Sequence, residues 1–272
     1  LRGGANRHPN AEADSEPSGL LTLYDAARDV LPQTRASPSV PLNLVARLRG
    51  GEVRVDMMQV EQAKPMVAFY KESELSFGFL SNFFVTQCRM NVLVGTQVFT
   101  VLSNILCATG VDIVHLQFTS SETVLMLIKA MVFNDWATVQ RLALEPFVTP
   151  DMAKRHGRRI RGYDDTVWGG VRLTAMCVAL HCKFESTPRL AARLLSTGDV
   201  PLYECSKYDK VWGTGVALGA FQASWPHVNI TGSNLLGKAL GTVRSSLKAK
   251  AAAVAAEAAH LRARGYDDAT LA

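Results

Sequence analysis

Residues 119–130 read TSSETVLMLIKA, and the chain is best understood outward from them. Thr119 stands three residues before Glu122, which is the spacing of a capping box and predicts the start of a helix. The run from Val124 to Ile128 is apolar on every side, which predicts a buried helix. Lys129 follows Glu122 by about two turns, roughly 10 Å along the same helix face.

A carboxylate and an amine that face the same way from a buried helix suggest one polar pocket. Two simpler interpretations remain open from the residues alone. Glu122 can serve only as a helix cap, and Lys129 can extend its ammonium group to water along the apolar surface.

The composition describes a protein with a sizeable core and a modest positive charge. The chain has 272 residues, of which 48% are hydrophobic, with 29 Lys and Arg against 24 Asp and Glu, a net charge of +5. This charge permits a polyanionic partner without requiring one. The five cysteines include no Cys-x-x-Cys pair, so we expect neither disulfides nor a metal site, and a reducing compartment. Apolar runs fall short of the ~20 residues of a membrane span, so we expect no membrane partner and an intracellular, cytoplasmic or nuclear protein.

By composition we divide the chain into three parts: residues 1–65, 66–247 and 248–272. The first is an extension whose opening, rich in Gly, Pro, Asn and Ser, is expected to be partly disordered. Within it, residues 41–51 (PLNLVARLRGG) resemble the C-terminal tail of ubiquitin, which makes deubiquitinase processing after Gly51 a hypothesis; chance recurrence explains the string equally well. The last part is alanine-rich and predicts a helix.

Short strands and capped helices are expected in the central part. Periodicity and turn residues predict strands at 66–70, 85–90, 92–94, 97–102 and 111–118. Cap and stop residues predict helices at 135–144, 149–157, 167–184 and 187–198, the third of them mostly buried. A further helix is expected from residue 234 after a Ser233 cap, and residues 202–231 are expected to be irregular.

Four segments carry polar or special residues that packing alone does not require: 77–84 (FGFLSNFF), 154–161 (KRHGRRIR), 209–215 (DKVWGTG) and 231–237 (TGSNLLG). Aromatic rings can enclose a planar base, and arginines suit phosphates. Glycines let backbone approach a ligand closely, and a helix N-terminus favours anions. Each segment also has a plain interpretation, as a turn with core aromatics or a solvated basic face.

In their order along the chain these segments resemble the NADAR family, whose bacterial YbiA-like members are N-glycosidases. The resemblance extends from about residue 66 to 247. It is carried by Phe79 to Phe83, Ser121-Glu122 with Lys129, Trp168, Lys183-Phe184, Leu195 to Asp199, Leu202 to Glu204, Asp209 with Trp212 to Gly215, and Gly232 to Gly237 with Arg244. It implies a compact, predominantly helical α+β domain with short strands. It also implies hydrolysis of an N-glycosidic bond to ribose 5-phosphate or ADP-ribose, with no cofactor.

The resemblance and the chemistry together assign catalytic roles to Glu122, Lys129 and Asp209. The first carboxylate stabilises positive charge on the ribose and activates water, with Asp209 as the second carboxylate. Lys129 either holds the ribose or a phosphate as a fixed cation or attacks the opened sugar to form a Schiff base. The expected ligand-binding residues are Phe79, Ser81, Asn82, Phe83, Trp168, Trp212, Gly213, Gly215, Gly232 and Asn234. The expected phosphate contacts are Arg158, Arg159 and Arg161.

Three functions follow as alternatives. The first is removal of ADP-ribose from guanine in nucleic acid, favoured by the basic run, with ADP-ribose or ADP-ribosylated nucleic acid as partner. The second is hydrolysis of ribosylamino-pyrimidine phosphates of riboflavin biosynthesis. The third is a catalytically silent ADP-ribose-binding module, because residues 123–126 lack the aromatics and glutamine that usually follow the Ser-Glu pair in the family.

Overall fold

Helix α3, Ser121–Val132, lies at the centre of the structure, and all its residues except Lys129 and Val132 are buried. Its N-cap is Ser120, whose hydroxyl accepts a hydrogen bond from the Thr123 N–H at 3.2 Å. The capping box expected from Thr119 is therefore wrong by one residue, because the Thr119 hydroxyl donates to the Val148 carbonyl instead. Glu122 is thus free of capping and directs its carboxylate elsewhere.

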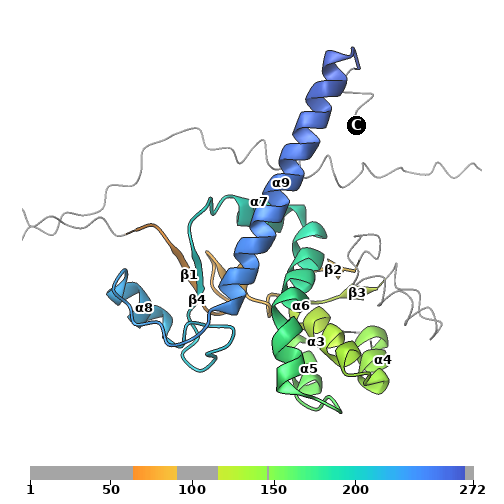
Figure 1. Ribbon diagram of the computed structural model, residues 1–272, viewed down its shortest axis with the longest axis vertical. Helices are drawn as coiled ribbons and strands as arrows, with labels where there is room; N and C mark the ends of the chain where they lie inside the picture. Colours follow the sequence, from red (N-terminus) through yellow and green to blue (C-terminus); the bar gives the residue numbers. More distant parts are fainter. Residues whose placement is uncertain (1–63, 91–115, 146, 267–272) are drawn as a thin grey trace, which may run out of the picture.

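The structure is a computed structural model that describes residues 64–90, 116–145 and 147–266. Within these ranges it contains seven α-helices, one short 3₁₀ helix (η1, Gly78–Leu80) and four short strands (Figure 1). The predicted α+β class, predominantly helical, is confirmed. The ubiquitin-like segment 41–51 and the strands expected at 92–94 and 97–102 lie outside the described residues.

Four helices pack around α3 and α6. Helices α4 (Trp136–Leu144), α5 (Pro150–Gly157) and α6 (Asp165–Glu185) contact α3, and α7 (Pro188–Leu195) and α9 (Leu235–Ala263) contact α6. The predicted starts of α4 and α5 are confirmed, since Asp135 and Thr149 accept hydrogen bonds from the first-turn N–H groups.

Two expectations for the long helices need correction. Helix α6 begins at Asp165, and its N-terminal half is mostly exposed rather than buried, with Val167, Val171 and Leu173 open to solvent and Trp168 buried. Helix α9 begins after Asn234, which takes a left-handed conformation at φ 49°, so Ser233 is not its cap. This helix runs unbroken to Ala263, and its last turns extend away from the other elements (Figure 1).

The strands form two small sheets. Strand β1 (Val67–Phe69) pairs in parallel with β4 (Leu202–Glu204), and β2 (Cys88–Arg89) pairs antiparallel with β3 (Gln117–Phe118). Helix α8 (Leu218–Ser224) forms within the segment expected to be irregular, because Phe221 is fully buried.

Side chains alternate along β4. Tyr203 packs on the rings of Phe221 and Trp225 beside α8, whereas Leu202 belongs to the main core. Glu204 therefore faces the same side as Leu202, toward the interior of the domain.

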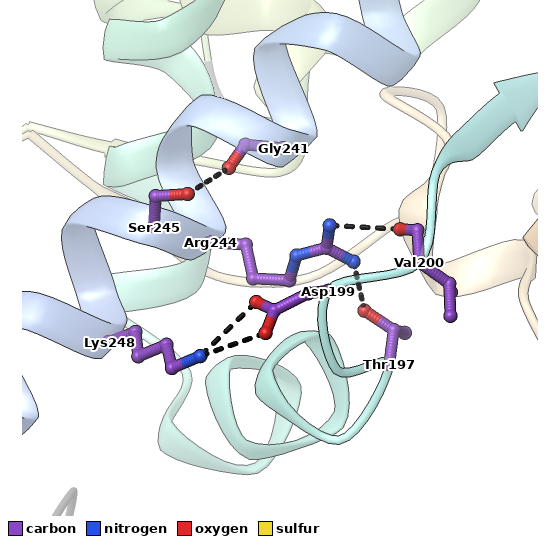
Figure 2. A network of polar contacts seen from close by, with 7 residues as sticks. All are labelled: Thr197, Asp199, Val200, Gly241, Arg244, Ser245 and Lys248. Atoms are coloured by element: carbon purple, nitrogen blue, oxygen red, sulfur yellow. Dashed lines mark hydrogen bonds and ion pairs between the residues drawn. The ribbon is translucent and has the colours of Figure 1, made fainter.

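A buried arginine on α9 holds the segment that precedes β4, residues 197–200, against that helix. Arg244 is 8% exposed and donates to the Thr197 hydroxyl at 2.7 Å and to the Val200 carbonyl at 2.9 Å (Figure 2). One turn later, Lys248 pairs with Asp199 at 3.1 Å, but these two side chains are 65% and 83% exposed. None of the described helices is long and apolar enough to cross a membrane.

We expect Arg244→Met to lower the free energy of unfolding by about 2–4 kcal/mol, because hydrogen bonds to charged groups contribute about 1.5–3 kcal/mol each. Lys248→Met is the matched control. Its exposed ion pair should contribute less than about 1 kcal/mol. Urea unfolding of both variants measures the two losses, and similar losses would contradict the special position of Arg244.

Candidate active site

One pocket lies where the buried start of α3 meets α5, the first turns of α6 and the loop after β4. Its volume is about 190 Å³. The sequence-predicted residues that line it are Ser81, Asn82, Phe83, Glu122, Lys129, Arg158, Trp168, Asp209 and Trp212. Five further lining residues were not predicted as site residues: Leu125, Met126, Lys154, Gly157 and Glu204.

Glu122 is held by the loop that contains Asn82. The carboxylate oxygen Oε2 accepts a hydrogen bond from Asn82 Nδ2 at 2.8 Å, and the Glu122 N–H donates to the Asn82 carbonyl at 3.1 Å. The residue is 4% exposed, and burial raises the pKa of its carboxyl against the lowering effect of the Asn82 hydrogen bond. Asn82 therefore fixes the carboxyl group in position and favours its charged form.

Lys129 lies on the same face of α3 and is half-buried. Its Nζ donates to the Gly157 carbonyl at 3.0 Å and lies 4.2 Å from the centre of the Tyr163 ring. Burial lowers the pKa of this amine, while the negative charge of Glu122 raises it. Desolvation of this kind brings a lysine closer to the neutral, nucleophilic form.

Two more carboxyl groups come from β4 and the loop after it. Glu204 ends the strand and Asp209 follows in the loop, where its Oδ1 accepts hydrogen bonds from the N–H groups of Val211 and Trp212. Burial, followed by the charge of Asp209, raises the pKa of Glu204 to about 8. In the described ranges there is no group of three or more His, Cys, Asp or Glu that could hold a metal ion.

A buried lysine that does not line the pocket holds the loop that contains Ser81 and Asn82. Lys183 is fully buried on α6, and its Nζ donates to the Ser81 carbonyl at 2.8 Å. Burial lowers the pKa of this amine to about 7. Lys183 does not line the pocket, so it acts by holding the 81–83 loop that positions Asn82.

The predicted phosphate contacts lie in different settings. Arg158 lines the pocket and is exposed, whereas Arg159 is exposed without lining it. Arg161 lies 3.1 Å from Asp135 Oδ1, so its guanidinium joins the loop after α5 to the start of α4. Lys154, on the pocket side of α5, lies 5.0 Å from the centre of the Phe83 ring.

Five predicted ligand-binding residues lie outside the lining: Phe79, Gly213, Gly215, Gly232 and Asn234. Phe79 is a core residue, 2% exposed, against Phe184. The glycines let the backbone near Gly213 and the backbone near Gly232 meet in a close junction. A Cβ on Gly232 would lie 2.3 Å from the Gly213 carbonyl oxygen.

Asn234 joins that junction to β4. Its side chain accepts from the Glu204 N–H at 3.0 Å and donates to the Leu202 carbonyl at 2.9 Å. It therefore orients the strand that carries Glu204 into the pocket.

The signal that would have identified Glu204 is a carboxylate at the end of a short strand, five residues before another carboxylate. Lys154 belongs to the basic run 154–161. Its place in the pocket lining follows from the face of α5 on which it lies, and the composition of the run alone does not indicate that face. Met126 packs against Gly157, and only a glycine fits there, because an added Cβ would lie 1.9 Å from the Met126 sulfur.

The chain belongs to the NADAR domain family, which matches residues 68–248 and confirms the family resemblance. It is 31% identical over 132 residues to N-glycosidase R617 of Acanthamoeba polyphaga mimivirus, covering 47% of this chain and 74% of that protein. It is 38% identical over 71 residues to the chloroplastic riboflavin biosynthesis protein PYRR of Zea mays, covering 25% of this chain but only 11% of that protein. The NMR structure of the Escherichia coli protein YbiA matches with a TM-score of 0.49 and 24% identity, over 72% of this chain and 93% of that one.

The raised pKa of Glu204 predicts a pH-dependent stability. Because folding favours its protonated form, the stabilisation is complete below about pH 4.5 and is lost as the pH rises toward about 8. Glu204→Gln has no such proton to lose. The difference in unfolding free energy, variant minus wild type, should therefore rise by about 3–5 kcal/mol between pH 4.5 and pH 9.

Urea unfolding at a series of pH values measures this difference. Lys183 titrates in both proteins, so its contribution cancels. Parallel stability curves for variant and wild type would contradict the raised pKa.

Proposed function

We propose that this protein is an N-glycosidase that hydrolyses the bond between the ribose of ADP-ribose and a guanine base in nucleic acid. The observation that carries the proposal is the buried Glu122 carboxyl, fixed by Asn82 and placed in one pocket with Lys129. The name of the mimivirus relative, an N-glycosidase, supports the reaction class.

Cleavage of an N-glycosidic bond is favoured by a pocket that places a carboxylate beside the ribose. When the bond from C1′ to nitrogen breaks, positive charge develops on the ribose ring, and a nearby carboxylate stabilises it. Glu122 has the position for this role and for taking a proton from the attacking water. Asp209 adds a second negative charge to the same wall, and Trp168 and Trp212 supply rings on which a base can lie.

Lys129 has two possible functions, and its surroundings define them. As a cation it orients the ribose or its phosphate. As a neutral amine it attacks C1′ of the opened sugar and forms a Schiff base, which water then hydrolyses. Its partial burial and lowered pKa support the second possibility.

The size and charge of the pocket support a nucleotide substrate whose ribose enters the pocket while its pyrophosphate remains outside. About 190 Å³ is less than the roughly 300–1,000 Å³ of pockets that enclose a drug-sized ligand, so it suits a ribose with part of a base. Arg158 lines the pocket and is exposed, so it can contact a pyrophosphate or a nucleic-acid backbone that extends out of the pocket.

A second candidate is hydrolysis of ribosylamino-pyrimidine phosphates of riboflavin biosynthesis. The name of the maize relative favours it, although that match covers a small part of the relative. Such a small substrate also fits the pocket volume. A silent ADP-ribose-binding module remains the third candidate, which any turnover excludes.

We expect Glu122→Gln to lower kcat/KM on an ADP-ribosylated guanine oligonucleotide by about 10²–10⁴-fold, the usual contribution of a general base. Lys129→Met should cause a loss of similar size. Glu257→Gln, an exposed change on α9, is the control and should keep wild-type activity. Release of ADP-ribose is followed by chromatography, and activity that survives both pocket substitutions would overturn the site.

Lys129→Arg separates the two functions of the lysine. An arginine keeps the charge but forms no Schiff base, so activity retained by this variant would indicate a fixed cation. Borohydride added during turnover should trap an imine only in the wild type, which mass spectrometry detects as a covalent adduct.

Salt dependence distinguishes a nucleic-acid substrate from a free ribosylamine. Since each phosphate contact releases counterions, Arg158→Ala should reduce the slope of log(kcat/KM) against log[salt] by about one. Arg189→Ala, an exposed arginine on α7, is the matched control and should leave the slope unchanged. Turnover of a ribosylamino-pyrimidine phosphate, with none of the oligonucleotide, would favour the second candidate.

A further inference from the structure

The departing base poses a chemical requirement that Glu122 and Lys129 do not meet together. As the C1′–N bond breaks, its electron pair moves to the nitrogen of the base, which needs a proton to leave as a neutral molecule. Glu122 is assigned to the water, and Lys129 to the sugar. A third group is therefore needed on the side of the base.

Asp209 already serves as a hydrogen-bond acceptor in the loop after β4. Its Oδ1 already accepts hydrogen bonds from the N–H groups of Val211 at 3.0 Å and Trp212 at 2.8 Å. These contacts use the carboxylate as an acceptor and fix it at the turn.

Glu204 has the opposite surroundings. Its side chain lines the pocket, and its Oε2 is buried without a hydrogen-bond partner among the described residues. A buried carboxyl oxygen without a partner is costly unless a ligand or a proton completes it. The orphan atom thus indicates a contact that forms only when the pocket is filled.

The backbone of Glu204 is held on both sides, so the side chain starts from a fixed point. Its N–H donates to Asn234 Oδ1 at 3.0 Å, and its carbonyl accepts from the Thr214 N–H at 2.8 Å. The parallel pairing of β4 with β1, in which Glu204 lies opposite Phe69, also restrains this backbone. Such fixed positioning is what proton transfer in a transition state requires.

The charges around Glu204 keep a proton on it at neutral pH. Burial and the negative charges of Asp209 and Glu122 raise its pKa to about 8, against the opposing charge of Lys154. The titratable and charged groups that line the pocket with it are Glu122 and Lys129 from α3, Lys154 and Arg158 from α5, and Asp209 from the loop.

We propose that Glu204 is the catalytic acid that donates a proton to the leaving base, an inference that rests on the proposed function. The C1′–N bond breaks, its electrons go to the nitrogen, and the Glu204 proton forms the new N–H bond. Water adds its oxygen to C1′ and gives one proton to Glu122. Exchange with solvent returns that proton to Glu204, so the net reaction consumes one water.

The test uses one oligonucleotide in two forms with different leaving groups. The first carries an ADP-ribosylated guanine. The second carries the same group on an N7-methylated guanine, which is cationic and leaves without an added proton. We expect Glu204→Gln to lower kcat/KM by at least about 100-fold on the first and by less than about 10-fold on the second. Glu257→Gln is the control on both.

A wild-type pH profile gives an independent measurement that does not depend on the folding of a variant. Because the acid must be protonated, kcat/KM on the first substrate should fall as the pH rises through about 8. The fall should be weaker on the N7-methylated substrate.

Equal losses on both substrates, or an alkaline fall of equal size on both, would overturn the role of Glu204 while leaving the N-glycosidase in place. Absence of wild-type turnover on both substrates would instead overturn the proposed function and this role with it.

Discussion

The structure depends on the hydrogen bond that Asn82 donates to the buried carboxyl of Glu122. Helix α3 is enclosed on almost every side, so a carboxyl group in its first turn loses its contact with water. Such a group costs several kcal/mol unless other groups replace the water. Asn82 supplies the replacement and must itself be held, which Lys183 achieves through the Ser81 carbonyl. Three distant parts of the chain are thereby fixed around one carboxyl group, and the pocket opens beside it.

The pocket then gathers groups whose charges oppose one another in a small, partly apolar space. Three carboxyl groups cannot all be ionised there at low cost, and burial raises the pKa of both Glu122 and Glu204. Glu122 has a hydrogen-bond donor that favours its charged form, whereas the Oε2 of Glu204 has none. Lysines compensate from two helices, Lys129 from α3 and Lys154 from α5. The same crowding that costs stability leaves Glu122 and Glu204 in different hydrogen-bonding surroundings, and the proposed base and acid roles use that difference.

Local patterns in the sequence were sufficient for most of the fold but for only part of the site. Helices α4 and α5 begin after residues whose side chains cap them, and α5 and α7 begin with a proline, so their positions follow from short-range chemistry. The pairing of Glu122 with Lys129 also follows from helix periodicity. Asn234 and the glycines were expected to touch a ligand, yet they join the segment after β4 to the start of α9. That junction depends on contacts about 30 residues apart in sequence, which no local pattern reveals. Glu204 does carry a local signal, since it ends a short strand five residues before Asp209, but its place in the pocket depends on its contact with Asn234.

Polar groups that cost stability lie on one side of the domain, and favourable packing lies on the other. Buried polar groups gather where α3, α5 and β4 meet, and two of their atoms without a hydrogen-bond partner, Asn82 Oδ1 and Glu204 Oε2, lower stability. On the other side, α6 packs on α9 along an apolar surface, and Arg244 satisfies the carbonyl at the entry to β4. The strand that carries Glu204 is thus held near its beginning through Arg244 and at its end through Asn234, the residue before α9. The long helix therefore contributes to the site although it supplies none of the residues that line it.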